Sequence, residues 1–191
     1  GATSLAGAVD DDFPEGQSAS FLEELHNEHP EIEERQYQAD CLDKLIHVRS
    51  LGLKRALVNM ATGLGKTTVV ATDTKRYTEI EQPGAKVLFL SHRNEIGDQA
   101  RLRFENIIGG DPKKFGTLNG VRKENTNAQF LFASIQTLQG RKEDYDPEEF
   151  DYVIVDEGHH GKAESYEPLI MHFRPKFLLG LTATPDRADL Q

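Results

Sequence analysis

The chain has 191 residues, of which 37% are hydrophobic, so it can bury the core of one domain. No apolar run approaches the roughly 18 residues that span a bilayer, so we expect no membrane segment. The chain has one cysteine, Cys41, no cysteine or histidine spacing typical of zinc sites, and no signal peptide. We therefore expect an intracellular, cytoplasmic protein in which Cys41 belongs to the core.

The net charge of −10 is confined to the N-terminal part of the chain. Residues 1–34 contain ten Asp or Glu and no Lys or Arg, whereas the 22 acids and 22 bases of residues 35–191 cancel. The run Asp10-Asp-Asp12 lies among many small residues, which is typical of a solvated linker. We expect residues 1–34 to form an acidic linker with a short helix, and residues 35–191 to form the globular domain.

The chain then alternates between amphipathic helices and short apolar strands. The expected helices are Ser20–Glu28, ended by Pro30, then Gln36–Leu51, stopped by Gly52, Thr67–Glu79, Asn94–Ile107 and Glu164–Phe173. The expected strands are Arg55–Met60, Lys86–Ser91, Gln129–Ile135, Tyr152–Val155 and Phe177–Leu181. Nearly continuous apolar strands that alternate with helices predict an α/β fold with a mostly parallel sheet covered on both faces.

Three of these strands end in polar residues that can bind a ligand or take part in a reaction. The first runs into a glycine loop, the fourth into Asp156 and Glu157, and the fifth into Thr182-Ala-Thr184. Ligands of open parallel sheets bind beyond the carboxyl ends of the strands, so we expect these three segments to converge on one site.

The glycine loop is the run Met60-Ala-Thr-Gly-Leu-Gly-Lys-Thr67. Its two glycines let backbone N–H groups point toward one anion, while Lys66 and Thr67 can serve phosphate and magnesium. The usual phosphate-loop pattern has a further glycine where this chain has Met60, so the match is incomplete. A simple glycine turn is the alternative interpretation.

The second motif, Val153-Ile-Val-Asp-Glu-Gly-His-His160, ends a buried strand in two carboxylates. Asp156 can hold magnesium, and Glu157 can polarise the water that attacks a phosphoryl group. A charged turn after a strand is the alternative, but its occurrence 90 residues after Lys66 favours hydrolysis of nucleoside triphosphates. The two histidines lack the i, i+4 helical spacing of a zinc pair, so we reject a metal role for them.

Three runs, in this order, resemble motifs I, II and III of the superfamily 2 helicases and translocases. They are Ala61-Thr-Gly-Leu-Gly-Lys-Thr67, Asp156-Glu-Gly-His159 and Thr182-Ala-Thr184. Three further segments fit the same template: Arg35-Gln-Tyr-Gln38 resembles the adenine-reading element, Ser91-His-Arg-Asn-Glu-Ile-Gly-Asp-Gln99 resembles motif Ia, and Ser134-Ile-Gln-Thr-Leu138 resembles the next strand-tracking motif. The best match is the DExH branch that contains restriction-enzyme motor subunits and repair-type duplex DNA helicases. The resemblance implies a three-layer RecA-like P-loop domain.

The resemblance also implies ATP and Mg²⁺ as cofactors and nucleic acid, DNA rather than RNA, as the partner. The implied catalytic residues are Lys66, Asp156, Glu157 and His159, and the implied magnesium ligands are Thr67 and Asp156. The implied ATP-binding residues are Arg35, Gln38, Thr62, Gly63, Leu64, Gly65, Lys66, Thr67 and Thr68. The implied nucleic-acid contacts are Ser91, His92, Arg93, Gln136 and Thr137, whereas Thr182 and Thr184 would couple hydrolysis to nucleic-acid grip.

Each of these roles has an ordinary alternative. Gln38 reads equally as a surface helix residue, Arg35 as a cation near a helix cap, and Thr182-Ala-Thr184 as a strand end before a turn. Gly158 stands where alanine is usual in this branch, a small-for-small change that leaves the neighbouring carboxylates in place.

The family has a second RecA-like domain, C-terminal to this one, whose arginines complete the ATP site. We therefore expect the 191-residue chain to be nearly inactive as a hydrolase without it. Two rival functions stay open: a P-loop ATPase acting on a protein or small molecule, and an ATP-binding module without turnover. Retention of Glu157 weighs against the second.

Overall fold

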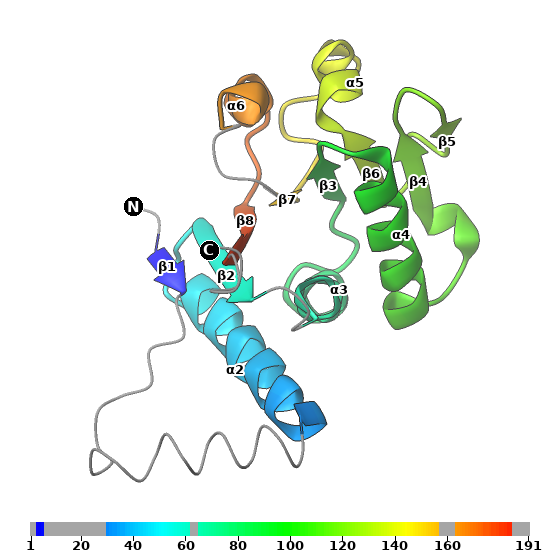
Figure 1. Cartoon of the computed structure of the whole chain (residues 1–191). Helices are drawn as coiled ribbons and strands as arrows, with labels where there is room; N and C mark the ends of the chain where they lie inside the picture. The colour runs from blue at the N-terminus through cyan, green and yellow to red at the C-terminus, as the bar shows by residue number, and fades with distance from the viewer. Residues whose placement is uncertain (1–2, 6–29, 62–64, 157–162, 185–191) are drawn as a thin grey trace, which may run out of the picture.

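The computed structural model describes residues 3–5, 30–61, 65–156 and 163–184. These residues form one eight-stranded sheet in the order β1-β2-β8-β7-β3-β6-β4-β5, with helices on both sides (Figure 1). The strands are β1 (Thr3–Leu5), β2 (Arg55–Ala61), β3 (Val87–Ser91), β4 (Phe115–Leu118), β5 (Lys123–Glu124), β6 (Phe130–Ser134), β7 (Tyr152–Asp156) and β8 (Phe177–Thr184). Strands β4 and β5 pair antiparallel, and the other pairs are parallel.

The helices connect successive strands. They are α2 (Pro30–Ser50), α3 (Lys66–Arg76), α4 (Asn94–Ile108), α5 (Ile135–Gln139) and α6 (Ala163–His172), together with the π-helical turn η1 (Tyr77–Glu81) and the 3₁₀ turns η2 (Pro112–Lys114) and η3 (Lys142–Asp144). Among the described residues, no helix is long and apolar enough to cross a membrane.

The central strands bury both of their faces. On β3, Val87 and Phe89 belong to the core beneath α2, α3 and α4, whereas Leu88 and Leu90 belong to the core beneath α5 and α6. Strands β6 and β7 alternate in the same way. A slip of one residue would move every side chain into the wrong core, so this alternation specifies the register of the sheet. The three layers confirm the predicted α/β fold with a mostly parallel central sheet.

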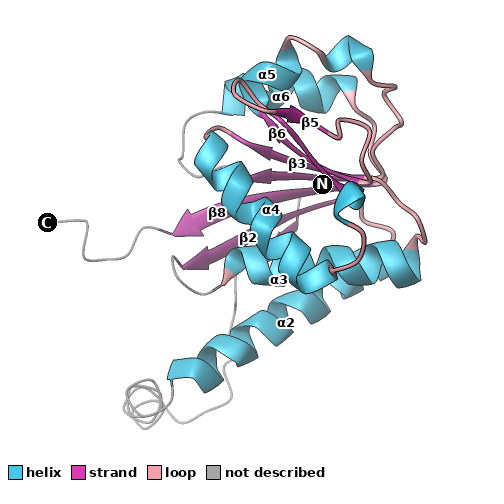
Figure 2. Ribbon diagram, turned by 90° about the vertical axis from the view of Figure 1, so that its right-hand side faces the viewer, coloured by secondary structure: helices cyan, strands magenta, loops and turns pink. Residues whose placement is uncertain are grey.

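Because the central strands are parallel, their C-terminal ends share one edge of the sheet, which we call the carboxyl edge; the opposite edge is the amino edge. Figure 2 shows the arrows of β2, β8 and β3 pointing the same way, toward the carboxyl edge. The same view shows α2 and α3 both beginning on that side. The register places Ser91 of β3 beside Asp156 of β7 and Ser134 of β6.

Two expectations about the N-terminal part were wrong in detail. Helix α2 begins at Pro30 rather than Gln36, because the first N–H groups of a helix have no partner within it and proline loses nothing there. The expected domain boundary at residue 35 therefore falls inside a helix. Strand β1, which pairs with β2, lies within the expected linker. The expected helix at residues 20–28 lies outside the described residues.

The remaining differences concern short elements. Strands β4 and β5 and helix α5 are not predicted from the sequence, and each has five residues or fewer. Helix α5 begins at Ile135, the last residue of the expected strand, because the Ser134 side chain accepts a hydrogen bond from the N–H of Thr137 and caps the helix.

Candidate functional site

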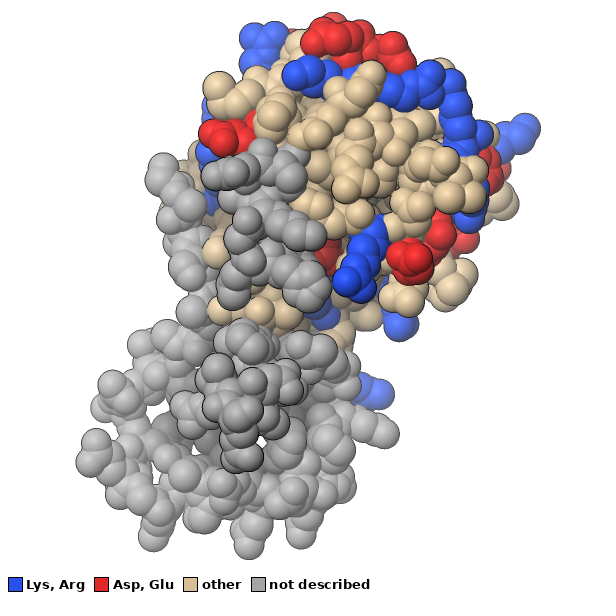
Figure 3. All heavy atoms as spheres, turned by 45° about the horizontal axis from the view of Figure 1, so that its top comes forward, with Lys and Arg blue, Asp and Glu red and all other residues tan. Residues whose placement is uncertain are grey.

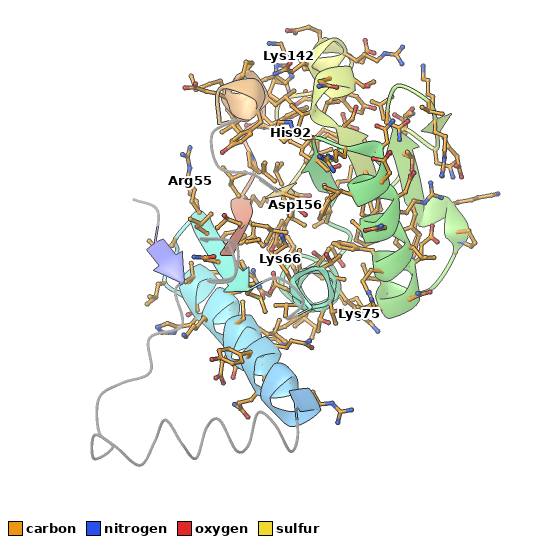
Figure 4. The ribbon with its side chains drawn as sticks, in the orientation of Figure 1. Arg55, Lys66, Lys75, His92, Lys142 and Asp156 are labelled. Atoms are coloured by element: carbon orange, nitrogen blue, oxygen red, sulfur yellow. The ribbon has the colours of Figure 1, made fainter. Side chains whose placement is uncertain are left out.

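An ion pair between Lys66 and Asp156 lies in the middle of the carboxyl edge. The Lys66 Nζ atom donates to Asp156 Oδ1 over 3.3 Å, although 90 residues separate the two in the chain. Lys66 is the first residue of α3, and Asp156 is the last residue of β7. Figure 4 shows both labelled side chains close to one another beside α3. The structure thus brings together the two residues that carry the first two predicted motifs.

The N-terminus of α3 is suited to an anion. Gly65 precedes it with φ of 72° and ψ of 35°, a left-handed conformation that glycine adopts without steric cost. No side chain caps this helix, and its first turn holds no acidic residue. The helix dipole and the early N–H groups therefore leave positive potential beside the Lys66 ammonium group. Thr67 and Thr68 follow in the same turn and are half-buried.

Asp156 is the carboxylate that this potential faces. Its side chain is 7% exposed, and the alternation along β7 puts it on the same side of the sheet as α3. Leu181 of β8 and Ser91 of β3 flank it in the sheet. A buried carboxylate beside a lysine and a helix N-terminus is chemically able to hold a divalent cation that is bound to a phosphate group.

The predicted nucleic-acid contacts line the next part of the same edge. The Ser91 hydroxyl donates to the backbone oxygen of Arg93, which precedes α4 in an extended conformation and is exposed. His92 is half-buried between them. Beyond β6, Gln136 is exposed, whereas the Thr137 hydroxyl accepts a hydrogen bond from Ser134 over 2.8 Å. Thr137 is thus already engaged in the cap of α5.

Gly97 is a contributor to this edge that the sequence did not single out. A Cβ atom on Gly97 would lie 3.2 Å from the Ser91 hydroxyl, so the glycine permits the start of α4 to approach the end of β3. A lone glycine within a helical pattern was the available signal.

The other predicted residues divide into three groups. Thr182 is buried beside Asn59 of β2, and the alternation along β8 puts it on the side of the sheet opposite to Asp156. Thr184 pairs with Ala61 through its backbone. Arg35 and Gln38 lie on α2, exposed and half-buried respectively. Thr62, Gly63, Leu64, Glu157 and His159 lie outside the described residues, and so does the side chain of Thr184.

Comparison with known proteins identifies the family. Residues 31–187 match the family described as Type III restriction enzyme, res subunit. The chain belongs to this family. The match spans every motif predicted from the sequence and confirms the resemblance to the helicase and restriction-motor group.

Two curated relatives agree with this assignment. A Saccharomyces cerevisiae protein named as an ATP-dependent helicase, IRC3, is 32% identical over 165 residues, covering 81% of this chain and 24% of the relative. The Type I restriction enzyme EcoAI endonuclease subunit of Escherichia coli is 30% identical over 164 residues, covering 79% of this chain and 19% of that subunit. The chain therefore spans about a quarter or less of the length of these relatives.

The solved structures support the same fold. The UvsW helicase from Bacteriophage T4 superposes with a TM-score of 0.62 and 19% sequence identity, covering 80% of this chain and 53% of that chain. At this identity the likeness shows the RecA-like fold and nothing about the substrate.

Proposed function

We propose that this chain is the ATP-binding and ATP-hydrolysing motor domain of a nucleic-acid-dependent DExH helicase or translocase that acts on DNA. The observation that carries the proposal is the Lys66–Asp156 pair at the uncapped N-terminus of α3. Membership of the family and the ATP-dependent helicase name of IRC3 support it. DNA is favoured because one relative is a restriction enzyme subunit.

The phosphates of ATP would bind at the start of α3. Backbone N–H groups from Thr62 to Lys66 would hold them, and the Lys66 ammonium group would stabilise charge on the outer phosphates. The donor set at this position fits magnesium, because a hydroxyl and a carboxylate are hard oxygen ligands. The Thr67 hydroxyl and Asp156 would hold the ion, which would supply positive charge beside the phosphates.

Hydrolysis then needs a positioned water. Glu157, the residue after Asp156, would orient it and accept its proton. His159 would link this region to motif III, where Thr182 and Thr184 would couple hydrolysis to the grip on nucleic acid. Arg35 and Gln38 would recognise adenine, which would make ATP the preferred nucleotide. The arginines that complete the site would come from a second RecA-like domain.

Nucleic acid would run along the carboxyl edge over the ends of β3 and β6. Ser91, His92, Arg93, Gln136 and Thr137 would contact its sugar-phosphate backbone, which positions a strand without reading its sequence. In Figure 3, lysine and arginine side chains alternate with acidic ones around a broad area of other residues. Acids and bases are equal in number over residues 35–191, so we expect weak binding that salt weakens further.

Nucleotide binding to the 191-residue chain tests the first half of the proposal. Magnesium ATP at a hundredfold excess over its Kd should stabilise the fold by about 2.7 kcal/mol, which raises Tm by about 5–10 °C. Lys66→Ala should remove most of this shift. Lys86→Ala is the matched control, because Lys86 also pairs with a carboxylate, Glu149, at 2.8 Å, but does so at the amino edge. Equal shifts in both variants would contradict the role of Lys66.

Nucleic-acid binding tests the second half. Labelled single-stranded DNA, duplex DNA and RNA should be titrated at several salt concentrations with the wild-type chain, Arg93→Ala and the control Arg55→Ala, which removes an exposed arginine at the start of β2 (Figure 4). Arg93→Ala should lower the slope of log K against log salt concentration by about 1, because one phosphate contact is lost. Arg55→Ala should leave this slope unchanged. Stimulation of ATP turnover by nucleic acid in a longer protein separates a motor from a P-loop ATPase with another substrate.

A further inference from the structure

The described residues include a buried charge cluster that the proposed function does not use. The Arg49 guanidinium group makes two hydrogen bonds to Asp73, over 2.9 and 2.6 Å, and two to Glu81, over 2.8 and 2.9 Å. The Tyr152 hydroxyl donates to the same Asp73 carboxylate over 2.7 Å. Arg49 and Asp73 are 7% and 0% exposed, so these charges are held almost without water.

Aromatic rings enclose the guanidinium group. Its central carbon lies 5.3, 5.9 and 5.0 Å from the ring centres of Tyr77, Tyr152 and Phe177. Tyr152 and Phe177 are the first residues of β7 and β8, which places the cluster at the amino edge. The cluster therefore fastens α2 to α3, to η1 and to the sheet through a single side chain. Arg49 suits this task because its planar fork binds carboxylates in two directions and stacks on rings.

Among the described side chains of α2, residues 35–50, the C-terminal half is the more deeply buried one. Leu45 and Val48 are fully or almost fully buried near Arg49. In the opposite half, residues 35–40 are exposed except for the half-buried Gln38. Figure 2 shows the beginning of α2 extending away from the sheet on the side of the carboxyl edge. Helix α2 is thus anchored near its C-terminal end, and Arg35 and Gln38 lie on its less buried N-terminal half.

Because α2 is anchored near Arg49, a small tilt of the helix about this residue displaces its opposite end. Gln38 lies about 16 Å along the helix axis from Arg49, at about 1.5 Å per residue. A tilt of about 5° about Arg49 would displace Gln38 by about 1.4 Å, which exceeds the range over which a hydrogen bond keeps its strength. Helix α3, which carries Lys66 at its own beginning, is fixed by the same cluster through Asp73. One cluster thus sets the spacing between the two helix ends.

We propose that Arg49 and Asp73 are positioning residues for base selection: they hold the adenine-reading end of α2 in register with the phosphate-binding end of α3. The inference rests on the proposed function, because it needs Arg35 and Gln38 to contact adenine. It assigns the preference for adenine over other bases to a contact at the opposite edge of the sheet from the nucleotide.

The test compares ATP with ligands that lack adenine. Kd values for magnesium ATP, magnesium GTP and magnesium tripolyphosphate should be measured for the wild-type chain and for Arg49→Met/Asp73→Asn. This double variant removes both buried charges, and replacing a buried ion pair by neutral groups often preserves folding. The new amide oxygen can still accept the Tyr152 hydroxyl. Arg49→Lys is the second variant, which keeps both charges and loses the two-directional fork.

The matched control is Arg101→Met/Glu105→Gln. Arg101 is 11% exposed and binds Glu105 over 2.7 Å and the Thr117 hydroxyl over 2.9 Å, so it fastens α4 to the sheet and leaves α2 unaffected. Tm values of all chains confirm that each one is folded. Glu81→Gln, at the 22% exposed rim of the cluster, is a milder variant that should shift ATP binding in the same direction.

The Arg49 variants should raise the Kd of ATP by about 2- to 30-fold, a typical range for residues that couple without touching a ligand, and should reduce the preference for ATP over GTP. The Kd of tripolyphosphate should stay within about twofold. If Arg49 and Asp73 had a purely structural role, the Kd values of all three ligands would change together or none would change. Either result would overturn the inference. If the wild-type chain binds none of the ligands, the proposed function itself fails. If the wild type prefers ATP and folded variants keep that preference, only the role of Arg49 and Asp73 is wrong.

Discussion

The two edges of the sheet each hold a cation beside an aspartate, and they hold them differently. At the amino edge, Arg49 and Asp73 meet through two hydrogen bonds of 2.9 and 2.6 Å. At the carboxyl edge, Lys66 meets Asp156 through one contact of 3.3 Å, and the lysine is 19% exposed. In the first pair, both carboxylate oxygens of Asp73 and four N–H groups of Arg49 have protein partners, whereas the second pair stands at a helix N-terminus that no side chain caps.

The pKa of Arg49 also reflects its close pairing at the amino edge. Burial by itself would lower the pKa of Arg49, but its hydrogen bonds to Asp73 and Glu81 outweigh burial and raise that pKa above the usual value. The Arg49 charge is already compensated by two carboxylates of the protein. A lysine at a helix N-terminus that no side chain caps offers positive potential to a phosphate group. The uncapped helix N-terminus beside Lys66, rather than charge alone, distinguishes the carboxyl edge from the amino edge.

The largest expected effect concerns turnover at the carboxyl edge. Without an arginine from a second domain, the 191-residue chain should hydrolyse ATP about 10³–10⁵ times more slowly than a longer protein that contains both domains and is bound to nucleic acid. Steady-state phosphate release by the two proteins under the same conditions measures the difference. Comparable rates would mean that the carboxyl edge is complete as it stands, and the contrast with the amino edge would then be lost.

The next effect is on stability at the amino edge. Arg49→Met leaves the 0% exposed Asp73 without its cation, which should destabilise the fold by about 3–5 kcal/mol and lower Tm by about 6–20 °C. Thermal unfolding followed by circular dichroism gives the shift. A change of less than 1 kcal/mol would show that water enters to solvate Asp73 in place of the guanidinium group, and that the cluster is looser than its distances indicate.

The corresponding change at the carboxyl edge should be much smaller. Lys66→Met removes one long contact from a pair to which solvent has access, so the unfolding free energy should change by about 1 kcal/mol or less in the absence of nucleotide. The same thermal unfolding measurement applies. A loss as large as that of Arg49→Met would make the Lys66–Asp156 pair a structural element and would remove the distinction between the edges.

Sequence reasoning found the carboxyl edge because its signals are local. A glycine loop, two adjacent carboxylates and a Thr-Ala-Thr run each lie within a few residues, and strands that bury both faces are continuous apolar segments. Parallel pairing then implies that their ends meet. Ser91 and Thr137 were named through the resemblance to helicase motifs, which gave no sign that Thr137 would be engaged by Ser134.

The charge cluster at the amino edge could not be predicted from the sequence, for a physical reason. Arg49 and Asp73 lie 24 residues apart on different helices, and Asp73 reads as an ordinary polar position of α3. Only the packing of α2 on α3 reveals that it is buried. Pro30 was interpreted only as the end of a preceding helix, whereas it also begins α2, because proline is well accommodated at the first position of a helix. Elements as short as β5 have no periodicity to detect.

The smallest effect is a loss of stability at alkaline pH that arises from groups near the amino-edge cluster. Burial, with a contribution from Asp73, raises the pKa of the Cys41 thiol to about 11 from 9.0. Burial, with a contribution from Asp151, raises the pKa of Tyr77 to about 12 from 10.0. Between these values the folded chain retains protons that the unfolded chain has lost, so its stability is complete below pH 9 and falls as pH rises toward 11 or 12.

We expect Tm to fall by about 2–4 °C from these two groups between pH 8.5 and 10.5, less than full linkage would give, because solvent screens the half-buried Cys41. Because surface lysines also titrate in this range, the informative quantity is the difference between wild type and variant at each pH. Cys41→Ala should flatten the decline between pH 9 and 11, and Tyr77→Phe, which keeps the ring packed against Tyr152, should flatten it above pH 10. Lys66→Met should leave the decline unchanged, because the carboxyl-edge pair lies in the other region. If neither Cys41→Ala nor Tyr77→Phe alters the slope, these groups titrate as they do in water, and the amino edge is more open to solvent than its buried contacts indicate.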